Sequence, residues 1–107
     1  MSTSGRDRRM EDRVPYILEV KCEDFGPGQN LRISDLSRTG AFIDTSSSVR
    51  IGSVIQLGFK LQDLEFNVNA EVRHCVHHIG FGVQFLDLSA DEQYFLSFVL
   101  AHQSVRH

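Results

Sequence analysis

Residues 55–73, IQLGFKLQDLEFNVNAEVR, contain two segments in which apolar and polar side chains alternate. The apolar positions of the first segment are Ile55, Leu57, Phe59 and Leu61. Those of the second segment are Phe66, Val68, Ala70 and Val72. A period of two is typical of a strand with one buried face, and a turn is expected near Asp63. This stretch therefore predicts two β-strands joined by a short turn.

Four further short segments alternate in the same way, and turn-forming residues such as GPGQN at 26–30 separate them. These segments lie near Tyr16–Cys22, Leu31–Ser34, Ala41–Ile43 and Phe81–Phe85. Six short strands at intervals of about eight to twelve residues favour a mainly β fold, either an antiparallel sandwich or a small barrel. A closed barrel would also leave no exposed strand edges.

The C-terminal segment has a different period. Ser89 and Glu92 have the spacing of a capping box, in which each residue satisfies the other's backbone N–H. A helix is therefore expected from about Ala90 to His102, with an apolar face that packs on an end or side of the barrel. The apolar residues at helical spacing are Tyr94, Phe95, Phe98 and Val99. We expect the aromatic residues among them in the core or at a partner surface.

The composition is that of one compact domain. The chain has 107 residues, of which 41% are hydrophobic and 23% charged. No apolar run approaches the roughly 20 residues of a membrane span, which argues against an integral membrane protein. The first residues, MSTSGRDRR, lack the apolar region of a secretory signal, so we expect a cytoplasmic protein. The net charge of −3 argues against a general polyanion binder.

The basic residues are mostly Arg, and they are unevenly distributed along the chain. The chain has nine Arg but two Lys, and four of the Arg lie within residues 1–13. These thirteen polar residues predict a flexible, Arg-rich N-terminal arm, and residues 14–107 form the folded domain. Guanidinium groups suit bidentate binding of phosphate or of a guanine edge. The alternative is a solvated terminus in which nearby acidic residues pair with the arginines.

Two short motifs carry complementary chemistry. The first is Arg9-x-x-x-Arg13 on the arm, and the second is Asp35-x-Ser37-x-x-Gly40 between two predicted strands. Arginines can bind phosphate oxygens or guanine acceptors, whereas a carboxylate can accept hydrogen bonds from the opposite edge of guanine. The serine can donate or accept, and the glycine permits a tight turn and close approach of a ligand. Together the motifs suit a guanine nucleotide, although the second could also be a hairpin turn that needs no ligand.

In this order and strand context, the motifs resemble those of the PilZ domain, the bacterial receptor for cyclic di-GMP. The resemblance extends over almost the whole chain, from about Arg8 to Leu100. The stretch GFGVQFLDLS at 80–89, which leads into the predicted helix, is similar to the final strand and C-terminal helix of the family. The resemblance implies a six-stranded antiparallel β-barrel with a C-terminal helix.

The resemblance also implies a ligand and the residues that bind it. Arg9 and Arg13 would hold phosphate and guanine groups of cyclic di-GMP. Asp35 and Ser37 would contact a guanine from the barrel surface, and Gly40 would maintain the shape of the turn. All five motif positions agree with the family pattern.

The residue before the first motif arginine varies in the family. An arginine there, as at Arg8, goes with an intercalated pair of ligand molecules in place of one. The implied action is not enzymatic and needs no cofactor beyond this ligand. The loose arm would become ordered over the nucleotide and so signal to a separate, unidentified protein partner.

Other candidate sites have weaker patterns. His74, Cys75, His77 and His78 are potential zinc ligands, but no second cluster supplies the usual paired spacing, so we predict no metal site. We expect Cys22 and Cys75 to be buried or half-buried thiols. No catalytic set of Ser, His, Cys or paired carboxylates is recognisable, so we predict no enzyme. Two alternatives remain open: an interaction adaptor that does not bind nucleotide, and a small barrel that binds single-stranded nucleic acid.

Overall fold

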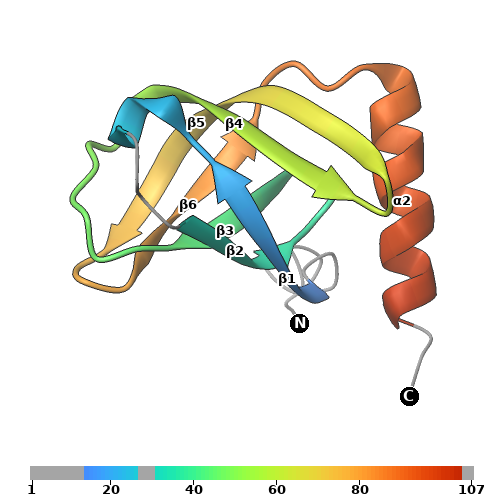
Figure 1. Cartoon of the computed structure of the whole chain (residues 1–107), viewed down its shortest axis with the longest axis horizontal. Coiled ribbons are helices and arrows are strands. Elements are labelled where there is room, and N and C mark those ends of the chain that lie inside the picture. The colour runs from blue at the N-terminus through green and yellow to red at the C-terminus, as the bar shows by residue number, and fades with distance from the viewer. Residues whose placement is uncertain (1–13, 27–30, 105–107) are drawn as a thin grey trace, which may run out of the picture.

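The computed structural model describes residues 14–26 and 31–104, and in this part of the chain it is a closed antiparallel barrel with one α-helix (Figure 1). The strands are β1 (Val14–Lys21), β2 (Leu31–Leu36), β3 (Gly40–Asp44), β4 (Val54–Leu61), β5 (Leu64–Val76) and β6 (Gly80–Phe85). Their order around the barrel is β1-β2-β3-β6-β5-β4, and pairing of β1 with β4 closes it. A 3-10 helix, η1 (Glu23–Phe25), follows β1, and α2 (Ala90–Ser104) ends the described chain. The predicted six-stranded barrel is therefore confirmed, and the sandwich is excluded.

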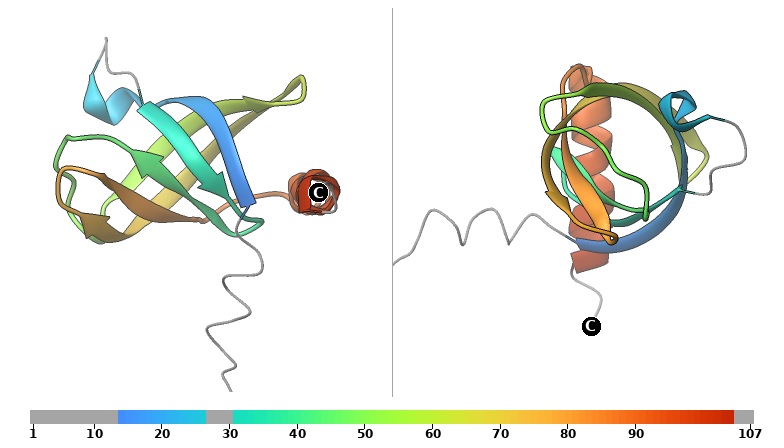
Figure 2. Two further views of the ribbon diagram at one scale, coloured as in Figure 1. Left: turned by 90° about the horizontal axis from the view of Figure 1, so that it is seen from below. Right: turned by 90° about the vertical axis from the view of Figure 1, so that its left-hand side faces the viewer.

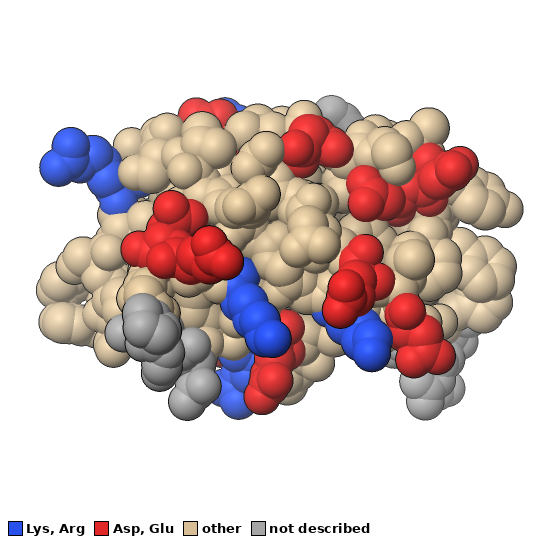
Figure 3. All heavy atoms as spheres, turned by 45° about the horizontal axis from the view of Figure 1, so that its top comes forward, with Lys and Arg blue, Asp and Glu red and all other residues tan. Residues whose placement is uncertain are grey.

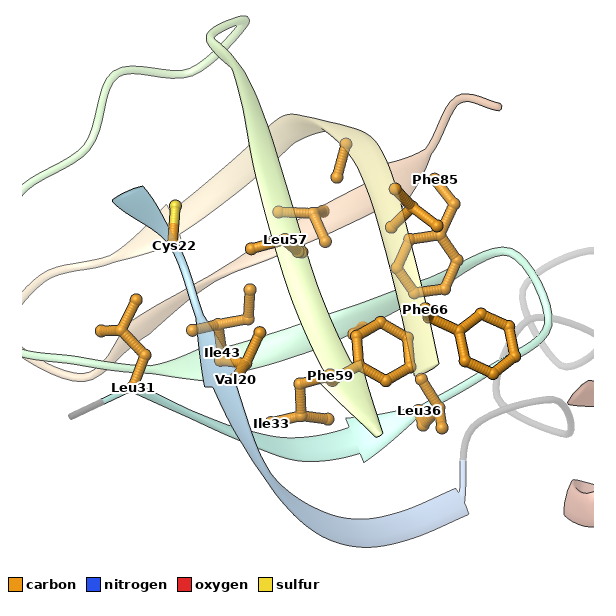
Figure 4. Close-up of a cluster of buried hydrophobic side chains, with 14 of the residues drawn as sticks. Val20, Cys22, Leu31, Ile33, Leu36, Ile43, Leu57, Phe59, Phe66 and Phe85 are labelled. Atoms are coloured by element: carbon orange, nitrogen blue, oxygen red, sulfur yellow. The ribbon is translucent and has the colours of Figure 1, made fainter. Parts of the chain in front are cut away.

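The alternating side chains of the strands fill the barrel. Along β4, Ile55, Leu57 and Leu61 point inward and are at most 5% exposed, whereas the polar residues between them face outward. The rings of Phe59 and Phe66 stack with their centroids 5.1 Å apart (Figure 4). Full burial of each such side chain contributes about 1.5–3 kcal/mol, so this interior is the main source of stability.

The strands β4 and β5 form the hairpin that the alternation predicted. Their ladder runs in unbroken register from Val54–Glu71 to Leu61–Leu64. The two-residue turn between them consists of Gln62 and Asp63, both in the left-handed region with φ of 49° and 76°. Positive φ at both central residues is the geometry of a type I′ hairpin turn, which matches the twist of the flanking strands.

The predicted capping box starts α2. Ser89 Oγ accepts a hydrogen bond from Glu92 N at 3.1 Å, and Glu92 Oε1 accepts one from Ser89 N at 2.9 Å. The helix lies across one end of the barrel (Figure 2). It buries Leu96, Val99 and Leu100 against that end.

The structure excludes one of two alternatives for two aromatic residues of α2. Tyr94 and Phe98 were expected in the core or at a partner surface, and the core is excluded because they are 74% and 51% exposed. The partner surface stays a prediction. Each helical residue turns by about 100°, so the stripe formed by Leu96, Val99 and Leu100 leaves Tyr94 and Phe98 on the opposite side. Phe95 lies at the edge of the stripe, with its ring centroid 6.2 Å from that of Phe66.

Two other expectations concern the N-terminal arm and membrane-spanning segments. The predicted arm, residues 1–13, lies outside the described residues. Among the residues that the structure describes, no helix has the length and apolar character needed to cross a membrane.

Candidate functional site

The turn between β2 and β3 contains the second motif and is organised by one buried serine. Ser37 is 8% exposed, and its Oγ accepts hydrogen bonds from the backbone N–H of Gly40 at 3.0 Å and of Thr39 at 3.2 Å. The Ser37 N–H also donates to the carbonyl of Gly40 at 2.8 Å. The hydroxyl therefore satisfies the backbone inside the turn, which makes Ser37 a determinant of the turn's shape.

Gly40 is required by close packing. Its φ is outside the left-handed region, but a Cβ at this position would overlap the carbonyl oxygen of Val83 on β6. From the sequence, this glycine was expected to permit a tight turn and the approach of a ligand. The structure gives another reason, since the backbone of β6 occupies the space that a side chain would need.

Asp35 is turned outward by an irregularity in the strand. The register of β2 with β3 shifts between Ile33 and Asp35, so Ile33 pairs with Ile43 but Asp35 pairs with Phe42. This bulge leaves Ile33 and Leu36 buried while Asp35 is half-buried on the outer wall. A bulge that redirects a side chain in this way is frequent next to binding sites.

Asp35 belongs to a row of residues that crosses the outer wall. The ladder pairs Asp35 on β2 with Phe42 on β3, Phe42 with Gly82 on β6, and Gly82 with His74 on β5. On the other side, Asp35 pairs with Pro15 of β1. Four strands thus place a carboxylate and two aromatic rings in one row.

The two rings lie against glycines of β6. A Cβ at Gly82 would lie 2.9 Å from both His74 Nδ1 and His74 Nε2, which shows that the imidazole covers this position. A Cβ at Gly80 would lie 2.7 Å from Cε2 of Phe42. The two ring centroids are 5.9 Å apart, and His74 is exposed while Phe42 is half-buried. This surface was not predicted from the sequence, although glycines inside a strand indicate the close approach of another group.

The described chain begins at Val14, where this row ends. Val14 and Pro15, the first residues of β1, pair with Leu36 and Asp35. Arg13, the last residue of the first motif, directly precedes Val14 in the sequence, and Val14 lies at the corner of the barrel that holds the second motif. Arg8, Arg9 and Arg13 themselves lie outside the described residues.

Charges elsewhere on the described surface are mixed. Arg32 of β2 forms an ion pair with Asp44 of β3 at 3.7 Å, and Arg73 donates a hydrogen bond to Gln84. On the face in Figure 3, acidic side chains are more abundant than Lys and Arg, and the basic ones do not form a continuous track. This face therefore gives no support to the nucleic-acid alternative, which needs a basic groove.

The histidines and cysteine near the end of β5 are not gathered into a metal site. His77 and His78 pack on each other with ring centroids 3.8 Å apart, and the thiol of Cys75 donates to the Val49 carbonyl at 3.2 Å. Within residues 14–26 and 31–104, no group of three or more His, Cys, Asp or Glu could hold a metal ion.

The two cysteines have different environments. Cys22 is 7% exposed, and burial raises the pKa of its thiol to about 11, so it stays protonated near neutral pH. Cys75 was expected to be at least half-buried, but it is exposed. It lies near the C-terminal end of β5, beyond the last buried residue of this strand, Val72. Figure 1 shows that β5 ends at the end of the barrel away from α2.

Comparisons with known proteins agree with this architecture. The family model of the PilZ domain matches residues 7–101. An inhibitor of motility from Bacillus subtilis, MotI/DgrA, superposes with a TM-score of 0.78 at 15% identity, over 89% of this chain and 51% of that one. The PilZ domain of CeSA from a cellulose-synthesizing bacterium has a TM-score of 0.55 at 17% identity, over 89% of this chain and 98% of that one.

These likenesses to solved structures concern the fold, and the chain spans about half the length of MotI/DgrA. No curated protein matches the chain. The family model, in contrast, covers nearly all of the barrel together with α2. The chain therefore belongs to the PilZ domain family.

Proposed function

We propose that this protein is a receptor for cyclic di-GMP, the ligand that PilZ domains generally bind, and that it acts without catalysis. The observation that carries the proposal is the pairing of Val14 and Pro15 with Leu36 and Asp35. The segment that contains Arg9 and Arg13 directly precedes Val14, and in the proposed complex it lies beside the Asp35–Gly40 turn. Arg9 is five residues from Val14, a distance of at most about 18 Å along the chain, so both arginines can reach the outer wall.

The proposed roles follow from the chemistry of each group. The Asp35 carboxylate accepts hydrogen bonds from N1–H and the amino group of a guanine, while Arg9 and Arg13 bind phosphate oxygens and the acceptor edge of a base. The rings of Phe42 and His74 provide a surface on which a base can stack. Ser37 and Gly40 contribute indirectly, since they shape the turn that presents Asp35.

The proposed signal is a change of surface. Binding orders residues 1–13 over the wall formed by β2 and β3, and a separate protein recognises the covered wall. The similarity to an inhibitor of motility supports action on a protein partner, because such an inhibitor controls machinery outside itself. Ordering the arm costs conformational entropy, which lowers the affinity for cyclic di-GMP. In return, the covered surface that the partner recognises forms only when the ligand is bound.

Titration calorimetry with cyclic di-GMP tests the proposal. We expect Arg9→Ala, Arg13→Ala and Asp35→Ala each to weaken binding by about ten- to hundredfold, as loss of a charge-assisted hydrogen bond predicts. Arg50→Ala is the matched control, because Arg50 is exposed in the loop between β3 and β4. Unchanged affinity in Arg13→Ala, or no binding by the unmodified chain, would contradict the proposal. The better explanation would then be an interaction adaptor that does not bind nucleotide.

Stoichiometry tests the role of Arg8 separately. If this arginine favours an intercalated pair of ligands, the unmodified chain binds two molecules and Arg8→Leu binds one. Calorimetry gives this ratio directly from the midpoint of the titration. A ratio of one in the unmodified chain would refute the role of Arg8 while leaving the receptor proposal intact.

A further inference from the structure

The outward face of α2 carries aromatic residues that the barrel does not use. Tyr94 and Phe98 are 74% and 51% exposed, and His102, one turn further along the helix, is also exposed. The rings of Phe98 and His102 are in contact, with centroids 4.2 Å apart. Since α2 lies across the end of the barrel, this face is directed away from the body of the domain (Figure 2).

The hydrogen-bonding groups on this face are complementary to each other. His102 Nδ1 lies 2.9 Å from the Phe98 carbonyl oxygen. A carbonyl can only accept, so Nδ1 carries the hydrogen and Nε2 of the neutral ring is an acceptor. Tyr94 is exposed, and its hydroxyl can donate a hydrogen bond. The face thus presents one donor and one acceptor.

The spacing of these residues is symmetric about Phe98. Tyr94 precedes it by four residues and His102 follows it by four, so all three lie on one side of the helix. A two-fold axis through Phe98 that relates two antiparallel helices therefore places Tyr94 of each copy opposite His102 of the other. Self-complementarity of this kind is the requirement for an isologous dimer.

We propose that the outward face of α2 binds a second copy of this chain. The two helices pack antiparallel, and the Phe98 rings meet at the axis. The Tyr94 hydroxyl of each copy donates to His102 Nε2 of the other. The two barrels lie on opposite sides of the helix pair, so the surfaces around Asp35 remain accessible, and the dimer is independent of nucleotide binding.

The contact is small. Two aromatic side chains and one imidazole per copy bury far less than the roughly 800 Å² per partner of a standard stable interface. Dimers are therefore expected at high protein concentration, with a dissociation constant of the order of 10–100 µM.

Sedimentation equilibrium between about 5 µM and 1 mM protein tests this expectation, because the range spans the expected dissociation constant. The mass should rise from 12.1 kDa toward twice that value with concentration. Phe98→Glu should abolish the rise, and Tyr94→Phe, which loses one hydroxyl, should weaken dimerisation severalfold. Ile79→Glu is the control, since Ile79 is 59% exposed in the turn between β5 and β6 and should have no effect. Circular dichroism melting verifies that each variant is folded.

The antiparallel arrangement has its own test. Tyr94→Cys and His102→Cys are each prepared with Cys75→Ser, mixed and oxidised. We expect the disulfide between positions 94 and 102 of two copies to exceed either symmetric disulfide. A monomer at every concentration, equal effects of Ile79→Glu and Phe98→Glu, or predominance of symmetric disulfides would overturn the proposal.

Discussion

Two tight turns of this barrel reach their shapes in different ways. The β4–β5 turn is local and exposed: Gln62 and Asp63 take left-handed conformations, although neither is glycine. The β2–β3 turn depends on the rest of the molecule, with Ser37 and Gly40 buried although Arg38 and Thr39 between them are exposed. There, Ser37 binds the backbone N–H groups of Thr39 and Gly40, and Gly40 lies against the carbonyl of Val83.

The difference shows why only one of the turns is part of the candidate site. A local turn can shift without disturbing its neighbours, whereas the β2–β3 turn is fixed on one side by its own serine and on the other by β6. That rigidity holds Asp35 at a defined place on the outer wall. Rigid support of this kind lowers the cost of binding a ligand, because less freedom is lost.

The largest effect is expected from Gly40→Ala. A Cβ at Gly40 overlaps backbone of β6, so the strands must separate, and we expect a loss of about 3 kcal/mol in the free energy of unfolding. Gly52→Ala is the informative control, because Gly52 has a φ of 93° but no atom within 4 Å of the added carbon. Its conformational cost should be about 1–2 kcal/mol. Urea denaturation measures both, and a smaller loss in Gly40→Ala than in Gly52→Ala would contradict our explanation of Gly40.

A smaller loss is expected from Ser37→Ala. This change leaves the backbone N–H groups of Thr39 and Gly40 without their side-chain acceptor and should cost about 1–3 kcal/mol. Ser46→Ala, in the exposed loop after β3, should change the unfolding free energy by less than about 0.5 kcal/mol. Thermal unfolding of both variants measures the difference in stability between them. Equal melting temperatures would show that the hydroxyl does not organise the turn.

The smallest effect, and the only stabilising one, is expected in the local turn. Replacing Gln62 by Asn and Asp63 by Gly gives the pair preferred in type I′ turns. Relief of the left-handed conformations should raise the free energy of unfolding by about 0.5–1 kcal/mol. Urea denaturation of the double variant checks this value. Destabilisation would mean that contacts of Gln62 or Asp63 matter more than their backbone conformation.

Most of the fold could be predicted from the sequence, because each strand has its own local alternation of apolar and polar residues. Alternation of Ile55, Leu57 and Leu61 reports a half-buried strand whatever its partners are. Ser89 and Glu92 cap the helix through contacts three residues apart. The sequence left Tyr94 and Phe98 open between the core and a partner surface, since helical spacing alone does not specify which of two apolar stripes meets the barrel.

The candidate site was predictable only in part. The Asp35, Ser37 and Gly40 motif is continuous in sequence and could be recognised. The contacts of Ser37 and Gly40 inside the turn could not be predicted in the same way, and contact of Ser37 with a ligand stays a prediction. Phe42 and His74 could not be placed beside Asp35, because the register shifts of β2 and β5 are set by pairing with other strands.

The order of apolar and polar residues was by itself enough to determine six strands, their turns and a capped helix, because these depend on contacts within a few residues. The closure of β1 on β4, the reason for Gly40 and the row from Asp35 to His74 were decided by tertiary structure. Each of them joins segments separated by many residues, and their relative position follows from how the barrel packs as a whole.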